Sequence, residues 1–262
     1  MYIEEDSYYG DTTFTLETDV RAEVIAKESF ILSGAEFSKL CFELCGAKAK
    51  QLLKDGDTVD RGDKILKIKG VSSHVLIAER TALNILQRMS GIATATRKIV
   101  EAVNPYGVKV AATRKTTPGF RLFEKIAVMH GGGDTHRMSL SDCVLIKDNH
   151  IAIAGSIKKA IEQARRASFT KKVEIEVSSV EDALEAVRCG ADIIMLDNMG
   201  VKEVEKAVKE IRRTGSVIIE ASGGITPDNA EMYAKAGVDV ISSGWITHSA
   251  RAVDISMKVD RE

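Results

Sequence analysis

The sequence predicts an α/β protein whose C-terminal part is a barrel of parallel strands. Two observations predict this class. After residue 107, apolar runs alternate with helical segments, and repeated strand–helix–strand units imply a parallel sheet. The ends of the later runs also recur regularly: Glu176 to Asp197 is 21 residues, Asp197 to Glu220 is 23, and Glu220 to Ser243 is 23. Short, regular units favour a barrel, in which every unit is equivalent.

The elements of this predicted barrel follow in order along the chain. The expected strands are the apolar runs at residues 108–112, 144–146, 173–177, 193–196, 217–219 and 238–241. The expected helices between the later strands cover residues 157–167, 180–187, 201–211 and 228–236.

The first hundred residues have a different pattern. They combine a helical segment near 34–45 and a turn-rich stretch at 54–70 with strand-like runs at 22–26, 64–69 and 75–78. This mixture predicts a β-rich α+β unit, and a long helical pattern follows over 79–103. The turn Asn104-Pro105-Tyr106-Gly107 then breaks the helix. We therefore predict two domains, residues 1–104 and residues 105–262.

Composition excludes several classes of protein. Lys and Arg number 37 against 38 Asp and Glu, so the net charge of −1 gives no general attraction to nucleic acid. A hydrophobic content of 44% is too high for a disordered chain, and no apolar run reaches the roughly 18 residues of a membrane span. Four cysteines in 262 residues do not make a disulfide scaffold, which predicts a reducing, cytoplasmic location.

A polar residue ends each apolar run of the predicted barrel. These ends are Arg114-Lys115, Lys147, Glu176, Asp197, Glu220 and Ser243-Gly244. Because the carboxyl ends of barrel strands meet on one face, the series predicts a functional site there. Glu174 and Glu176 share a face of their strand, and such carboxylates need cations, for which Lys115 and Lys147 are candidates.

The last two units contain small residues suited to phosphate. Ser222-Gly223-Gly224 precedes Thr226 and Pro227, which are expected to be the N-cap and first residue of a helix. Glycines let backbone N–H groups approach an anion, and barrels often hold phosphate in these loops. Ser243-Gly244 supplies a second such turn; a plain turn without a ligand is the alternative.

Cations gather in residues 112–150, with six Lys or Arg against four Asp or Glu and three of the five His. Arginine forks bind carboxylates and phosphates in bidentate fashion, so the predicted ligand is a small polyanion. The glycines 131–133 lie in the same stretch and predict either a close approach to the ligand or a flexible surface loop.

Ordered motifs along nearly the whole chain resemble one family. They are GDTT at 10–13, ERTALN at 79–84, SGIAT at 90–94, TRKTTPG at 113–119, GGG at 131–133, HR at 136–137, IKDNH at 146–150, EIEV at 174–177, LDN at 196–198 and THSA at 247–250. In these motifs the chain resembles the quinolinate phosphoribosyltransferases, the decarboxylating nicotinate-nucleotide pyrophosphorylases of NAD biosynthesis.

The resemblance implies an N-terminal α/β sandwich domain and an open, seven-stranded, TIM-like α/β barrel, with a C-terminal tail that can return to the N-terminal domain. It also implies a homodimer, with each active site shared between one barrel and the partner's N-terminal domain. The implied reaction joins quinolinate to phosphoribosyl pyrophosphate with Mg²⁺, giving nicotinate mononucleotide, pyrophosphate and CO₂.

The resemblance further assigns roles to individual positions. Arg114, His136, Arg137 and Lys147 resemble the quinolinate pocket, with Lys115 at the reacting centre. Glu176 and Asp197 resemble the acidic pair near the ribose and Mg²⁺, to which they bind directly or through water. Arg80 matches an arginine contributed by the partner subunit. The 5-phosphate would be held by Ser222, Gly223, Gly224, Ser243, Gly244 and His248.

Three positions depart from the family pattern: Ala112 stands where Asp is usual, Thr135 where Asn is usual, and Ser139 where Gly is frequent. Two alternative functions therefore stay open. One is the molybdenum-transport-associated branch of the same fold, with another substrate. The other is a non-catalytic protein that binds a phosphate ligand, although such a protein would not need the acidic pair.

Overall fold

The computed structural model describes residues 2–7, 12–13 and 17–261, so Gly10 and Asp11 of the first motif lie outside the described residues. The chain forms two compact units. The first comprises the described residues up to Arg97, Met129–Gly131 and the C-terminal segment from Ala250; the second comprises Lys98–Val128 and Gly132–Ser249. This division falls inside a long helix, before the boundary predicted at residue 104.

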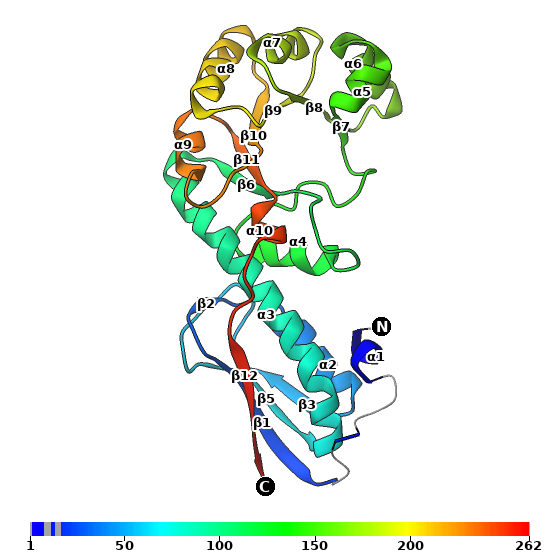
Figure 1. Ribbon diagram of the computed structural model, residues 1–262, viewed down its shortest axis with the longest axis vertical. Helices are drawn as coiled ribbons and strands as arrows, with labels where there is room; N and C mark the ends of the chain where they lie inside the picture. The colour runs from blue at the N-terminus through cyan, green and yellow to red at the C-terminus, as the bar shows by residue number, and fades with distance from the viewer. Residues whose placement is uncertain (1, 8–11, 14–16, 262) are drawn as a thin grey trace. The chain divides into compact units, whose positions relative to one another are not determined.

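A six-stranded parallel sheet forms the centre of the second unit, as the alternating pattern predicts (Figure 1). The strand order is β6-β11-β10-β9-β8-β7. The strands are β6 (Lys109–Ala112), β7 (Val144–Ile146), β8 (Val173–Val177), β9 (Ile193–Asp197), β10 (Ile218–Ser222) and β11 (Val240–Ser243). Each contains the core of the apolar run that predicted it, and Ile175, Ile194, Ile219 and Ile241 are fully buried.

The place of a seventh strand is reduced to a single bridge in the part of the chain that the structure describes. Asp134 pairs in parallel with Ala111 of β6 and exchanges hydrogen bonds with Val110 and Ala112 at 2.7 and 2.9 Å. The pairing stops at once because His136 has a left-handed backbone (φ 51°), which cannot continue a strand. The barrel is therefore open between β6 and β7.

Helices cover the outer side of the curved sheet (Figure 1). They are α6 (Ile157–Ala167), α7 (Val180–Arg188), α8 (Val201–Thr214) and α9 (Ala230–Lys235). Ser156 and Ser179 cap α6 and α7 by accepting a backbone N–H with their side chains.

The prediction that Thr226 and Pro227 begin a helix is wrong. Helix α9 begins at Ala230, and Asn229 is its N-cap residue. Asn229 Oδ1 accepts the N–H of Thr226 at 2.8 Å, and this bond closes a turn in front of the helix.

Two further helices of the second unit lie at the carboxyl ends of β7 and β11. They are α5 (Asp148–Ala154) and α10 (Trp245–His248). A short 3₁₀ helix, Asn104–Tyr106, precedes β6. Helix α4 (Arg121–His130) follows β6 and contributes its last two residues to the first unit.

The first unit contains an antiparallel sheet in the order β12-β1-β5-β3. Its strands are β1 (Asp19–Ala26), β3 (Lys48–Gln51), β5 (Lys64–Val71) and β12 (Ile255–Arg261). The C-terminal strand β12 pairs with β1, so the tail belongs to this unit. A small ribbon of β2 (Phe30–Ile31) and β4 (Thr58–Val59), the short helix α1 (Tyr2–Ser7) and the helix α2 (Ala35–Leu44) complete the unit.

The predicted strand at 75–78 is wrong, because these residues belong to helix α3 (Ser72–Val103). Val75, Ala78, Ala82 and Leu86 recur at helical spacing and are all fully buried. Four apolar residues are too few to distinguish a strand from a helical turn, so only the longer repeat shows the helix. Within the described residues, no helix is both long enough and apolar enough to cross a bilayer.

Candidate active site

The carboxyl ends of three neighbouring strands, β8, β9 and β10, bring predicted polar residues together. Glu176 on β8 is in register with Met195 on β9, which is in register with Glu220 on β10. One step further along, Asp197 is in register with Ser222. Because residues two apart on a strand share a face, these side chains project to one side of the sheet. The expected convergence on the C-terminal face is therefore present.

A cavity of about 450 Å³ lies at this face. Ten of the predicted site residues line it: Arg114, Lys115, His136, Arg137, Lys147, Glu176, Asp197, Ser222, Gly223 and Gly224. The lining combines five side chains that carry or can accept positive charge with carboxylates and a glycine turn. Such a lining suits an anionic ligand that also develops positive charge during reaction.

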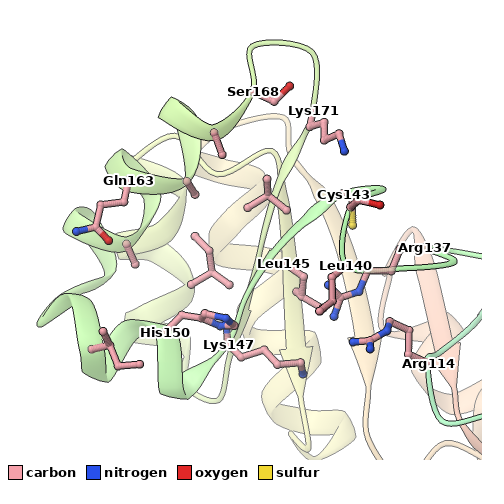
Figure 2. Close-up of a pocket in the computed structure, with 17 residues that line it drawn as sticks. Arg114, Arg137, Leu140, Cys143, Leu145, Lys147, His150, Gln163, Ser168 and Lys171 are labelled. Atoms are coloured by element: carbon pink, nitrogen blue, oxygen red, sulfur yellow. The ribbon is translucent and has the colours of Figure 1, made fainter.

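A second cavity, of about 880 Å³, adjoins the first and shares Arg114, Arg137 and Lys147 with it. Figure 2 shows these three cations at one end of the cavity, while β7 and helix α6 supply its more apolar remainder. Arg114 Nε is buried and has no hydrogen-bond partner among the described residues. A buried guanidinium N–H without a partner is costly, so it favours an anionic ligand at this position.

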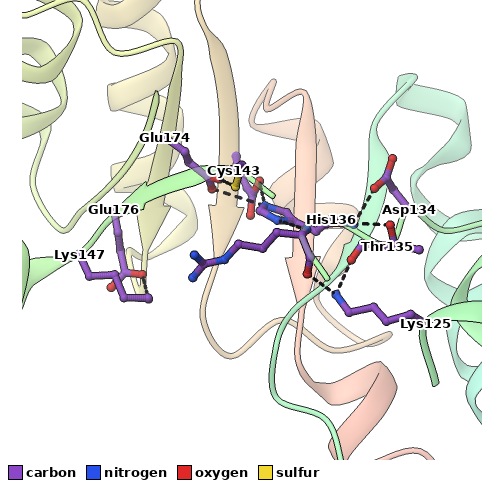
Figure 3. A network of polar contacts seen from close by, with 10 residues as sticks. Lys125, Asp134, Thr135, His136, Cys143, Lys147, Glu174 and Glu176 are labelled. Carbon is purple, nitrogen blue, oxygen red and sulfur yellow. Dashed lines mark hydrogen bonds and ion pairs between the residues drawn. The ribbon is translucent and has the colours of Figure 1, made fainter. Parts of the chain in front are cut away.

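Lys147 forms an ion pair with Glu176 (Figure 3). This agrees with the prediction that a lysine pairs with a carboxylate of this strand. Glu174 behaves differently: among the described residues it has no ion pair with Lys115 or Lys147 and instead lies beside His136. Its carboxylate lies 3.5 Å from His136 Nε2 and is 1% exposed. The lysines are therefore left facing the cavity rather than the deeper carboxylate.

His136 lies between two buried carboxylates. Its Nε2 is 3.3 Å from Glu220 Oε2 as well as 3.5 Å from Glu174 Oε1. Hydrogen bonds that His136 donates to Glu174 and then to Glu220 raise the pKa of His136 to about 10 against the opposing effect of burial. Burial raises the pKa of Glu174 in turn. The hydrogen bond from the Arg137 N–H to His136 Nδ1 (2.8 Å) opposes full protonation, but it places the first proton on Nε2, between the carboxylates.

One group of three potential metal ligands exists among the described residues: His136, Cys143 and Glu174. Two features oppose a metal there. Burial, and next the charge of Glu174, raise the pKa of the Cys143 thiol to about 11, so the thiolate is disfavoured. His136 Nε2 carries a proton and has no free lone pair while Nδ1 accepts from Arg137.

Glu176 and Asp197 better fit a hard cation such as Mg²⁺. Both line the cavity and offer carboxylate oxygens. Mg²⁺ commonly uses one or two protein carboxylates together with substrate phosphates and water. Asp197 Oδ2 accepts a hydrogen bond from Asn198 Nδ2 at 2.5 Å, which orients its carboxylate. The donor set therefore fits the metal that the sequence predicts, and the metal itself stays a prediction.

The glycine turn after β10 depends on a close contact. Gly223 has φ 94°, and a Cβ at this position would lie 2.3 Å from Asn198 Oδ1. Gly224 has φ 62° but open space around it. Only glycine suits the first position on both backbone and steric grounds.

The second small-residue turn, Ser243-Gly244, lies outside the lining of the 450 Å³ cavity. The Ser243 hydroxyl donates to the Ile225 carbonyl at 2.6 Å. A Cβ on Gly244 would come within 3.1 Å of both Lys115 and His248, so the glycine lets these two side chains lie close together. His248 is exposed.

None of the glycines 131–133 lines the cavities described, and Gly131 has a packing role. A Cβ on Gly131 would lie 2.6 Å from the Ala93 carbonyl oxygen and from the Thr96 side chain of helix α3. The residue is also buried, so the surface-loop alternative fails for it as well. Close packing against a helix explains this glycine.

Two residues that line the cavity are not predicted as site residues by the sequence, and one predicted residue belongs to the other unit. Glu220 was noticed only as a strand end, yet it lines the cavity and contacts His136. Asn198 also lines the cavity and has a left-handed backbone, φ 55°. The signals in the sequence are its position directly after Asp197 and its place in the LDN motif. Arg80 belongs to helix α3 in the first unit and is exposed.

A barrel whose carboxyl-end cavity combines cations, an acidic pair and a glycine turn defines an enzyme class that acts on small anionic, phosphorylated ligands. Comparison with known proteins identifies the family. Residues 92–258 match the family described as quinolinate phosphoribosyl transferase, C-terminal domain, and residues 8–90 match its N-terminal domain. The chain therefore belongs to the quinolinate phosphoribosyl transferase family, and the expected enzyme class, a phosphoribosyltransferase, is confirmed.

Individual relatives agree with this assignment. A probable carboxylating nicotinate-nucleotide pyrophosphorylase of Archaeoglobus fulgidus is 53% identical over 257 residues, which cover 96% of this chain and 98% of that protein. The carboxylating nicotinate-nucleotide pyrophosphorylase of Homo sapiens is 40% identical and covers 91% of this chain and 82% of its own length.

Solved structures show the same fold across the whole chain. NadC from Streptococcus pyogenes superposes with a TM-score of 0.92 at 42% identity, over 99% of this chain and 94% of that one. The nicotinate-nucleotide pyrophosphorylase from Francisella tularensis gives 0.93 at 39% identity, over 98% and 93%. The predicted combination of an N-terminal α/β domain and an open barrel is therefore confirmed. The relatives support the quinolinate reaction rather than either alternative function.

Proposed function

We propose that this chain transfers the phosphoribosyl group of phosphoribosyl pyrophosphate to the ring nitrogen of quinolinate, with loss of one carboxylate as CO₂. The products are nicotinate mononucleotide and pyrophosphate. The observation that carries this proposal is the convergence of Arg114, Arg137 and Lys147 on the 450 Å³ cavity that Glu176 and Asp197 also line. Cations for a dianionic acid and carboxylates for a cationic ribose are thus present together.

Quinolinate carries two carboxylates, and the cationic end of the cavity provides their complement. The guanidinium groups of Arg114 and Arg137 are suited to bidentate contacts with a carboxylate. Lys147 completes the set of cations, and His136 also lines the cavity. When CO₂ departs, electron density remains on a ring carbon, and these cations lower its energy until a proton replaces the lost group.

The phosphoribosyl half would occupy the acidic and glycine-rich side. As the bond to pyrophosphate breaks, positive charge develops at the anomeric carbon, and Glu176 and Asp197 stabilise it. Lys115 lies at the reacting centre and offsets charge on the leaving pyrophosphate. Backbone N–H groups at Ser222, Gly223 and Gly224 would hold the 5-phosphate, with Ser243, Gly244 and His248 nearby.

Mg²⁺ would be held by Glu176 and Asp197, directly or through water. When bound, it would neutralise charge on the pyrophosphate group. The carboxylate chemistry of these two residues supports this part of the proposal. Lys147 pairs with Glu176 and would hold its carboxylate in place.

The family resemblance extends the proposal to assembly and location. We expect a homodimer in which Arg80 of one protomer reaches the active site of its partner. The four cysteines are free thiols, which supports a reducing, cytoplasmic compartment.

The experiment supplies quinolinate labelled in its 2-carboxylate, phosphoribosyl pyrophosphate and Mg²⁺, and measures labelled CO₂ together with nicotinate mononucleotide. Both products are expected in equal amounts. Nicotinate replaces quinolinate in a control reaction, because it lacks the carboxylate that leaves. No CO₂ release from a folded protein would contradict the proposal.

A further inference from the structure

Helix α4 contains a buried lysine whose function the sequence does not explain. Lys125 is fully buried, as is its neighbour Glu124. Burying an ammonium group costs free energy unless its donors are satisfied. Lys125 directs its ammonium at two backbone carbonyls: Thr135 O, through a short contact, and Arg137 O at 3.1 Å.

These two carbonyls flank His136 on either side (Figure 3). His136 and Asn198 are the described non-glycine residues with positive φ, and the value for His136 is 51°. A left-handed conformation is unfavourable for a residue with a side chain, so surrounding contacts must impose it. Lys125 bridges the chain across this residue and thereby supplies such a contact.

Two other charged residues of helix α4, Arg121 and Glu124, contact the segments next to the cavity. Arg121 Nε donates to Thr116 Oγ1 at 2.9 Å, and its NH1 donates to Met138 O at 3.1 Å. Arg121 therefore links the loop after β6 to the segment that contains His136.

Glu124 holds the loop after β6 more firmly. Its carboxylate accepts the N–H of Thr117 at 3.1 Å and the Thr117 hydroxyl at 2.8 Å. Arg114 and Lys115 precede this threonine in the same loop. One helix thus secures two of the three segments that bring cations to the cavity.

The electrostatic setting of Lys125 is unfavourable. Burial, followed by repulsion from Arg121, lowers the pKa of Lys125 to about 8, although Asp134 acts in the opposite direction. Arg137 and Arg114 add smaller repulsions. An ammonium group placed among like charges does not serve stability through its charge, which points to a role in positioning.

We propose that Lys125 is a positioning residue for substrate binding: by holding the carbonyls of Thr135 and Arg137, it fixes His136 and Arg137 in the orientation that the quinolinate pocket needs. This inference rests on the proposed function, because it assumes that the cationic end of the cavity takes quinolinate. It predicts an effect on quinolinate and little effect on phosphoribosyl pyrophosphate, because the hydrogen bonds of Lys125 among the described residues do not reach the groups proposed to hold the latter: Lys115, Glu176, Asp197 and the turns after β10 and β11.

The test is Lys125→Met, which keeps the length of the side chain and removes its donors. We expect KM for quinolinate to rise at least about tenfold, which corresponds to about 1.4 kcal/mol. KM for phosphoribosyl pyrophosphate should stay within about twofold of the wild-type value, a change of no more than about 0.4 kcal/mol. Lys209→Met, at an exposed lysine of helix α8, is the matched control and should leave both constants unchanged.

Lys125→Gln provides the second variant, since its amide N–H groups can still donate to a carbonyl. It should recover part of the quinolinate affinity, and it serves as the main test if Lys125→Met does not fold. Unchanged quinolinate KM in folded variants would overturn the inference, as would an equal rise of both KM values, which indicates general loosening. Failure of the proposed function is a separate result, because it appears as absent turnover in the wild-type protein.

Discussion

At the scale of single residues, the two carboxylates of β8 differ in burial, and Glu176 is the more exposed of the two. Its side chain is 16% exposed and pairs with Lys147, whereas Glu174 is buried beside His136. The two carboxylates lie two residues apart on one strand but differ in depth. Glu176 lines the cavity, whereas Glu174 contacts His136.

Glu176→Gln tests this division of roles. We expect kcat to fall by roughly 10²–10³-fold, because a carboxylate that stabilises positive charge in the transition state becomes a neutral amide of the same shape. Thermal unfolding should change little, since the side chain is near the surface of the cavity. Steady-state CO₂ release measures the effect, with Glu181→Gln on the exposed side of helix α7 as the control. A folded Glu176→Gln enzyme with full kcat would remove Glu176 from the mechanism.

His136 makes the stability of the protein depend on pH. Its pKa is raised from 6.5 to about 10 by Glu174 and Glu220. A raised pKa in the folded state stabilises the protein fully below the unfolded value and loses this contribution as pH rises through the folded value. The difference in unfolding free energy between wild type and His136→Gln should therefore be largest near pH 6 and shrink towards pH 10. Urea unfolding at both pH values measures it, and a difference independent of pH would contradict the assignment.

At the scale of elements, the turn after β10 offers a matched pair of glycines. Gly223 and Gly224 both have positive φ, but only Gly223 would place a Cβ against Asn198. Alanine at either position incurs a backbone penalty of about 1 kcal/mol. Alanine at Gly223 must also displace Asn198, which orients Asp197.

We therefore expect Gly223→Ala to raise KM for phosphoribosyl pyrophosphate at least about tenfold more than Gly224→Ala does, equivalent to about 1.4 kcal/mol. Initial rates at saturating quinolinate give the comparison. Equal effects of the two substitutions would show that the contact with Asn198 does not matter for this substrate.

The elements differ in how well the sequence predicts them. The six barrel strands follow from their apolar runs because burial on both faces requires continuous hydrophobic residues. Residues 75–78 satisfy the same criterion and are nevertheless helical, because their burial comes from the longer α3 pattern. The start of α9 is also predicted wrongly. The side chain of Asn229, rather than that of Thr226, closes the turn before the helix, which therefore begins at Ala230.

At the scale of the whole molecule, the role proposed for Arg80 requires two protomers. Arg80→Ala and Lys115→Ala are each expected to be nearly inactive, because each removes one contribution to every site. A dimer containing one copy of each variant has one intact site if Arg80 acts in the partner. Mixing the two unfolded variants equally and refolding them should then restore about a quarter of the wild-type activity, because half of the dimers are mixed.

Refolded single variants provide the controls for this experiment. Recovered activity must appear only in the mixture and must elute as a dimer on gel filtration. No recovery from a mixture that forms dimers would place Arg80 in its own protomer's site or outside the site.

The sequence by itself determined the class of fold, the positions of the barrel strands and most of the cavity lining. These features depend on local periodicity and on strand ends, which are properties of consecutive residues. Tertiary structure decided which charges meet: His136 rather than a lysine lies beside Glu174, Glu220 joins the site, and Lys125 reaches the carbonyls around His136. Such pairings depend on side-chain depth and on contacts between separate segments. A one-dimensional pattern does not contain that information, because it fixes the face on which a residue lies but not the partner opposite it.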